Sequence, residues 1–117
     1  MFDKAHYAQL DMLTRVDYLD DSITDGGIEP DEIEEIARSP LSEEVIFNLV
    51  NKFYWKARKG EVLDDRVTQS LERLAKARMS ELKSHFPKMA LGRHAPGKME
   101  YDTTKEALDS LLDVIRP

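Results

Sequence analysis

Four cations recur at helical spacing in the second half of the chain, and this arrangement could bind phosphate. Arg66, Arg73, Lys76 and Lys83 fall within an arc of about 100° if their segment is a helix. Cations neutralise phosphates, and aromatic rings stack on unpaired bases, so nucleic-acid binding is one hypothesis. The alternative is a solvated helix face. We favour the solvated face, because the chain as a whole is acidic and shows no recognisable nucleic-acid motif.

Aromatic residues concentrate just upstream, where they could bind another protein. Phe47, Tyr54 and Trp55 are the candidates for partner contact. The same segment carries four cations: Lys52, Lys56, Arg58 and Lys59. Tryptophan is enriched at binding hot spots, but large aromatics are buried on average. We therefore expect Trp55 to be buried, in a second packing layer or a dimer seam, and we keep an exposed anchor as the alternative.

An acidic segment, residues 21–32, could bind a hard cation. It resembles an EF-hand calcium loop at positions 1, 5, 6, 8 and 12, which are Asp21, Asp25, Gly26, Ile28 and Glu32. Ile23 stands where the EF-hand pattern has a third oxygen ligand, and Pro30 lies inside the loop. The resemblance implies a metal-responsive accessory subunit as a second alternative function. We favour a structural turn between two helices and predict no metal site.

The sequence offers no catalytic constellation. Its histidines (His6, His85 and His94) are far apart, and it has no cysteine, nucleophile elbow or phosphate-binding glycine loop. Arg78 lies on the apolar face of its segment, so we expect a carboxylate partner from the acidic N-terminal half. We predict a protein that is not an enzyme, with no cofactor and no small-molecule substrate.

The net charge of −6 hides a strong segregation of charge along the chain. Residues 1–48 carry 13 acids and 3 bases (−10), residues 49–98 carry 5 acids and 12 bases (+7), and residues 99–117 carry 5 acids and 2 bases (−3). Such blocks either neutralise one another inside the fold or form separate binding surfaces. We favour neutralisation.

Helical periodicity dominates the sequence, and no segment reads as a strand. The expected helices cover residues 2–19, 30–38, 40–59 and 64–86, with turns at residues 20–27 and 60–63. Pro87 ends the fourth of these helices. Residues 87–102 hold two prolines and two glycines, and we expect an extended or mobile connector there. Thr103 and Glu106 then match a capping box that opens a terminal amphipathic helix over residues 103–116.

We therefore predict one all-α domain over residues 1–117, an irregular bundle of four or five helices with a long connector before the last helix. No apolar run approaches the roughly 20 residues that span a bilayer, so we expect no membrane partner and a cytoplasmic location. The favoured function is non-catalytic protein–protein interaction by a regulatory, adaptor or assembly protein, including self-association.

Overall fold

All regular elements in the described part of the chain are helices, which confirms the expected all-α fold. The computed structural model describes residues 2–40, 42–86 and 95–116. Six helices lie in these ranges: α1 (Lys4–Gln9), α2 (Met12–Asp25), α3 (Pro30–Ala37), α4 (Ser42–Arg58), α5 (Asp65–His85) and α6 (Lys98–Ile115). The count exceeds the expected four or five because one expected helix is two.

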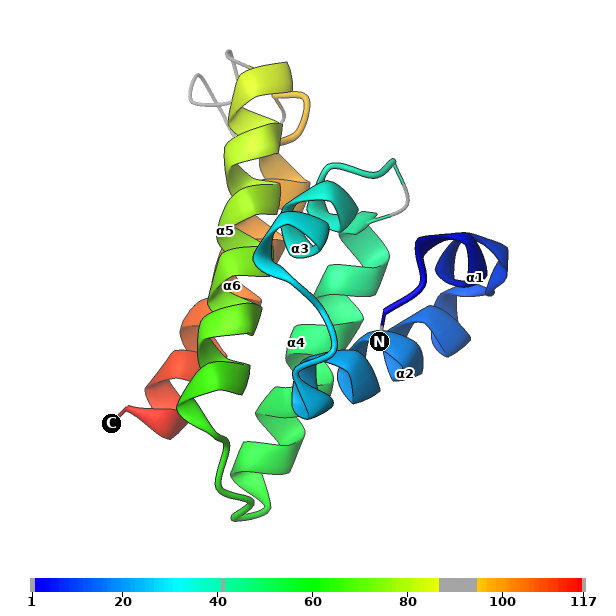
Figure 1. The fold of residues 1–117 in the computed structure, drawn as a ribbon. Coiled ribbons are helices and arrows are strands. Elements are labelled where there is room, and N and C mark those ends of the chain that lie inside the picture. Colours follow the sequence, from blue (N-terminus) through cyan, green and yellow to red (C-terminus); the bar gives the residue numbers. More distant parts are fainter. Residues whose placement is uncertain (1, 41, 87–94, 117) are drawn as a thin grey trace.

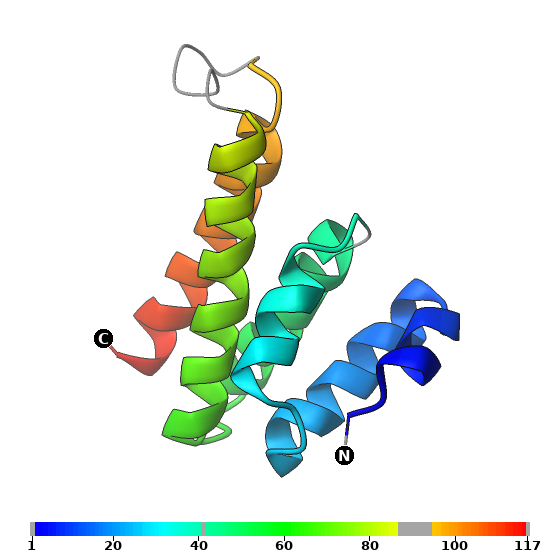
Figure 2. The same ribbon diagram turned by 45° about the horizontal axis from the view of Figure 1, so that its top comes forward.

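Helix α4 is the centre of the bundle. It packs against α2 on one side and α6 on the other, while α3 packs mainly on α5, and α5 also contacts α6. Figures 1 and 2 show α4 and α6 running in the same direction and α5 running opposite to them. This arrangement leaves one outward side of α4 between its two neighbours α2 and α6.

The core is built from aliphatic side chains that five of the helices contribute. Its largest fully buried members include Leu19, Ile23, Ile46, Leu49, Leu71, Leu74 and Leu111. These residues come from α2, α4, α5 and α6, and the cluster also includes Ile33 and Ile36 of α3 and Tyr7 of α1. Most apolar faces read from the helical period point inward, but Leu13, on the face predicted for residues 2–19, is 70% exposed.

The single helix expected over residues 2–19 is wrong, because the chain breaks before Asp11. The Asp11 carboxylate accepts a hydrogen bond from the Thr14 backbone N–H at 2.9 Å, and Asp11 itself is extended, so it caps a new helix. Arg15 Nε then donates to the Tyr7 carbonyl at 3.1 Å and satisfies a carbonyl at the end of α1. The break lets the N-terminal segment fold back over α2.

The turn expected over residues 20–27 is also shorter than predicted. Helix α2 continues through Asp25 and ends at Gly26, whose φ of 72° is the left-handed conformation that glycine adopts most readily. Helix α3 then starts at Pro30, as predicted, with Asp31 and Glu32 in its first turn. The aspartates of residues 20–25 therefore lie on a helix rather than in a loop.

Two other boundaries follow the sequence closely. Gly60 has a φ of 93° just after α4, and Asp64 caps α5 by accepting the Arg66 backbone N–H at 2.9 Å. Helix α4 begins at Ser42, slightly later than the predicted start at Pro40.

The last helix begins earlier than predicted. Helix α6 starts at Lys98, after Gly97, so the capping box expected at Thr103 and Glu106 is wrong and both residues lie inside the helix. Residues 98–102 are thus helical rather than part of a connector. Of the rest of the expected connector, residues 95–97 form a bend and turn before α6, and residues 87–94 lie outside the described residues.

Candidate functional site

Trp55 lies on the outward side of α4, although we expected it to be buried. Trp55 is 56% exposed, so the expectation that it is buried within this chain is wrong. The reason is its position on α4: the buried residues Leu49, Val50 and Phe53 occupy the inner face, and Trp55 points away from them. An indole ring that remains in contact with water marks this side of α4 as a candidate binding surface.

Trp55 belongs to a group of three contacting side chains that we call the aromatic–arginine cluster: Tyr54, Trp55 and Arg58. The two rings meet edge to face with centroids 5.4 Å apart. The Arg58 guanidinium lies 5.7 Å from the Tyr54 centroid and 5.8 Å from the Trp55 centroid. Arg58 Nη1 also donates to the Tyr54 hydroxyl at 2.8 Å. These contacts join the three side chains into one cluster at the surface of α4.

The opposite end of α4 carries an acidic hollow, which we define by Glu43, Glu44, Phe47, Met99 and Glu100. It has a volume of about 170 Å³ and lies between the first turns of α4 and α6. Met99 is 73% exposed, whereas Phe47 is half-buried against the core. The predicted partner residue Phe47 thus shares a surface with Met99, which the sequence analysis did not single out.

Glu43 also provides the carboxylate that Arg78 was expected to find. Arg78 is 11% exposed at its side chain, and its Nη2 lies 3.5 Å from Glu43 Oε2, which confirms the predicted partner from the acidic half. Burial and repulsion by Glu100 raise the pKa of Glu43, although Arg78 opposes that rise. The hollow is therefore rich in negative charge that one arginine only partly offsets.

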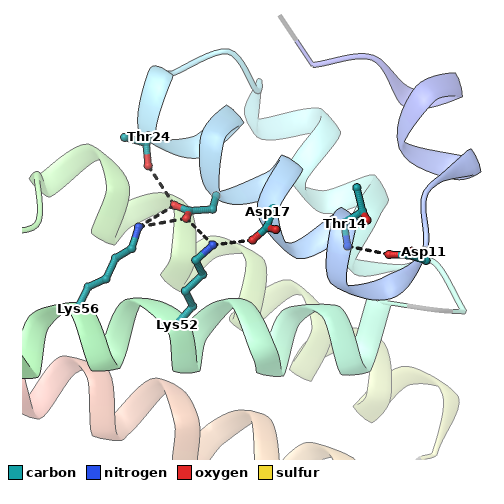
Figure 3. A network of polar contacts seen from close by, with 7 residues as sticks. Asp11, Thr14, Asp17, Thr24, Lys52 and Lys56 are labelled. Atoms are coloured by element: carbon teal, nitrogen blue, oxygen red, sulfur yellow. Dashed lines mark hydrogen bonds and ion pairs between the residues drawn. The ribbon is translucent and has the colours of Figure 1, made fainter.

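A polar network occupies the other flank of α4 and joins it to α2 (Figure 3). Lys52 Nζ lies 2.7 Å from Asp17 Oδ1 and 3.0 Å from Asp20 Oδ2, and Lys56 Nζ lies 3.1 Å from Asp20 Oδ2. The Thr24 hydroxyl donates to Asp20 at 3.3 Å. We call Asp17, Asp20, Thr24, Lys52 and Lys56 the Asp20 network.

The Asp20 network keeps its charges by mutual pairing. Burial of Asp20 by itself would raise its pKa, but hydrogen bonds and positive charge from Lys52 and Lys56 outweigh burial and hold that pKa below its usual value. Hydrogen bonding to Asp17 raises the pKa of Lys52. Lys52 and Lys56 therefore neutralise acids of the same chain, as the favoured interpretation of the charge blocks predicts.

The cations predicted on α5 are exposed, but most of them have contacts within the chain. Arg66 Nη2 donates to the Thr24 carbonyl at 3.0 Å. Lys76 Nζ lies 3.5 Å from Glu72 Oε2. Lys83 Nζ lies 5.2 Å from the centroid of the Tyr101 ring.

Arg73 completes this α5 basic surface, which we define as Arg66, Arg73, Lys76 and Lys83. Arg73 and Lys76 share a hollow of about 530 Å³ with Glu34 and Glu72. Glu34, an acid of the N-terminal half, therefore borders this surface, while the four cations remain exposed. The contacts of these cations are with α2, α5 and α6, so this surface is separate from the α4 aromatics.

The EF-hand-like segment does not have the shape of a metal loop. Asp21 to Asp25 are helical, and Ile23, at a ligand position of the pattern, is buried in the core. In the ranges that the structure describes, no group of three or more His, Cys, Asp or Glu side chains is placed to hold a metal ion. Thr24 of this segment instead belongs to the Asp20 network.

The outer side of α4 carries five residues whose regular spacing was not identified from the sequence. Glu44, Asn48, Asn51, Trp55 and Arg58 recur at spacings of four, three, four and three residues. The structure leaves these five positions exposed or half-exposed. This spacing was visible in the sequence, but polar residues at four of the five positions concealed it in a search for apolar faces.

No described helix is long and apolar enough to cross a membrane. No family model, curated protein or solved structure matches the chain.

Proposed function

We propose that this chain is a non-catalytic protein–protein interaction module of the cytoplasm that binds its partner through the outer side of α4. The observation that carries the proposal is the aromatic–arginine cluster. Trp55 is 56% exposed and is held in place by Tyr54 and Arg58. Tryptophan, tyrosine and arginine are the residue types that most often dominate binding energy at protein interfaces.

More than half of the Trp55 side chain is in contact with water and would be covered on binding. Covering the exposed part of one tryptophan contributes on the order of 2–3 kcal/mol by removal of apolar area. Contacts within the cluster reduce the number of rotamers that binding must freeze, so less conformational entropy is lost on association. A pre-arranged cluster of this kind supports a binding role better than a scattered set of exposed residues does.

Affinity capture with matched variants tests the proposal. The wild-type chain is expected to capture a protein partner or itself, and Trp55→Ala to lose that capture. Val62→Ala is the control, because Val62 is 96% exposed and lies in the loop beyond α4. Light scattering reports self-association in parallel. A strictly monomeric chain that captures nothing, or capture that Trp55→Ala leaves intact, contradicts the proposal.

Nucleic-acid binding is the second candidate, and one observation favours it. The four cations of the α5 basic surface are exposed, and Arg73 and Lys76 face a shared hollow. Against it, Lys52 and Lys56 are already paired with Asp17 and Asp20. Anisotropy of a labelled single-stranded oligonucleotide decides between the two: binding that weakens steeply with salt supports this candidate. Absence of binding at low salt removes it.

A further inference from the structure

The outer side of α4 has the residue spacing of a helix-pairing seam. We call Glu44, Asn48, Asn51, Trp55 and Arg58 the α4 stripe; their average spacing of 3.5 residues is the repeat that keeps one face of a helix against a partner helix. All five are exposed or half-exposed. The stripe therefore runs along the whole of α4, and among the described residues α2 reaches it at Asn48, through the Met12 sulfur.

The stripe carries opposite charges at its two ends. Glu44, beside Glu43, opens α4, and Arg58, followed by Lys59, closes it. The midpoint is Asn51, from which Glu44 and Arg58 are each seven residues away. Phe47 and Trp55 are likewise each four residues from Asn51. The helix is thus complementary to its own reversed copy, in charge at the ends and in apolar character between them.

We propose that the partner of this surface is a second copy of the same chain, paired antiparallel through α4 about a twofold axis at Asn51. The register places Arg58 of one copy beside Glu44 of the other, and Trp55 of one copy against Phe47 of the other. This inference rests on the proposed function and names its partner.

The acidic hollow gives the second copy a place to bind. Glu43, Glu44 and Glu100 surround the apolar Phe47 and Met99, and Arg78 is the cation that already contacts Glu43. A tryptophan edge fits the apolar lining, and the arginine one turn beyond it brings positive charge to the glutamates. The same contact forms twice, because a twofold interface is isologous.

Orientation follows from the same charges. A parallel pair would place Glu44 against Glu44 and Arg58 against Arg58, and like charges in contact disfavour association. In the antiparallel pair, Asn51 meets Asn51, and each amide has both a donor and an acceptor for the other. A central asparagine of this kind fixes the register of paired helices.

The expected affinity is modest. A single pair of helices covers less than the standard protein interface of roughly 1,600 Å². Met99 and Leu13 are 73% and 70% exposed, and Leu13 adjoins Met12, whose sulfur lies 4.0 Å from Asn48 Nδ2. These flanking residues extend the contact. We therefore expect a dissociation constant in the micromolar range.

Sedimentation analysis of charge-reversed variants tests the pairing. Glu44→Arg alone and Arg58→Glu alone should each raise the dissociation constant at least tenfold, since each creates two like-charge contacts per dimer. The double variant that carries both changes in one chain should associate again, because its reversed charges still match in the antiparallel register. In a parallel pair the double variant would remain repelled from itself.

Two controls complete the design. Arg73→Glu is a matched charge reversal on the α5 basic surface and should leave the dissociation constant unchanged. Circular dichroism melts establish that each variant is folded. Restored association of the double variant supports the proposal; a double variant that stays monomeric overturns it.

The wild-type result separates this inference from the proposed function. A wild-type chain that is monomeric up to millimolar concentration overturns self-pairing. If that monomer still captures another protein in a Trp55-dependent way, the proposed function stands. If it captures nothing, both fail.

Discussion

The cations on the two sides of α4 have different surroundings. On the flank toward α2, Lys52 and Lys56 are within ion-pair distance of Asp17 and Asp20, and the charges neutralise one another. On the outer side, Arg58 contacts two aromatic rings and remains exposed with Trp55. A lysine near an acid of its own chain contributes to the fold, whereas an arginine on exposed aromatics is available to a partner. Cations from one basic segment of the sequence can therefore pair with acids on one side of a helix and lie exposed on aromatic rings on the other side.

The largest expected effect comes from disrupting the Asp20 network, on the flank of α4 toward α2. Asp20→Asn removes the negative charge that Lys52 and Lys56 share, and we expect the free energy of unfolding to fall by about 2 kcal/mol. Denaturant unfolding followed by circular dichroism measures the change.

Asp17→Asn is the control for this variant. Asp17 is 70% exposed at its side chain, and among the described residues its ion pair is with Lys52, so its loss should cost less than about 0.5 kcal/mol. Equal losses for the two variants would show that the buried position of Asp20 does not matter.

Low pH should also weaken the Asp20 network. The pKa of Asp20 is lowered in the fold, so its contribution to stability is present above the usual aspartate pKa and is lost as the pH falls through the lowered value. The stability difference between wild type and Asp20→Asn should therefore be largest near neutral pH and shrink in acid. A difference that stays constant from neutral to strongly acidic pH would contradict the assigned pairing.

Lys52 determines the upper end of the pH range in which the Asp20 network stabilises the fold. Its pKa is raised in the fold, so its contribution is complete below the usual lysine pKa and is lost as the pH rises through the raised value. The network should therefore stabilise the protein over the whole range between the two limits.

On the outer side of α4, a substitution should have little effect on the stability of the fold. Trp55→Ala removes a side chain that is mostly in water, so the free energy of unfolding of the monomer should change by less than about 0.5 kcal/mol. Measured at a concentration where the chain is monomeric, a larger loss would mean that the tryptophan supports the fold rather than binding.

The smallest expected effect is that of calcium. Because Asp21 to Asp25 are helical, millimolar calcium should leave the melting temperature of the protein unchanged. Magnesium at equal concentration controls for ionic strength. A rise specific to calcium would restore the EF-hand-like interpretation of this segment.

The parts of the fold that the sequence predicted are those with one dominant local cause. The start of α5 depends on an aspartate cap, for which the sequence offers Asp64 or Asp65 and the structure uses Asp64, and the end of α4 depends on Gly60. The burial of Leu49 and Phe53 follows from the helical period alone. The Arg78–Glu43 pair was predictable because a buried cation needs an acid.

The parts that failed depend on competition between local signals or on long-range packing. The apolar positions of residues 2–19 stay in helical phase across the break at Asp11, so the period gave no sign of it. Thr103 offered a plausible cap, but the chain becomes helical already at Lys98. The exposure of Trp55 depends on where α2 and α6 lie, and no residue spacing within α4 determines their positions.

One measurement tests the central claim that a second copy covers the outer side of α4. Trp55 is the only tryptophan of the chain, so intrinsic fluorescence reports on this surface alone. As wild-type protein is concentrated from micromolar to millimolar, emission should shift to shorter wavelength and acrylamide quenching should weaken, while Arg58→Glu keeps the exposed signal. Emission that remains that of a water-exposed tryptophan at every concentration would contradict the account.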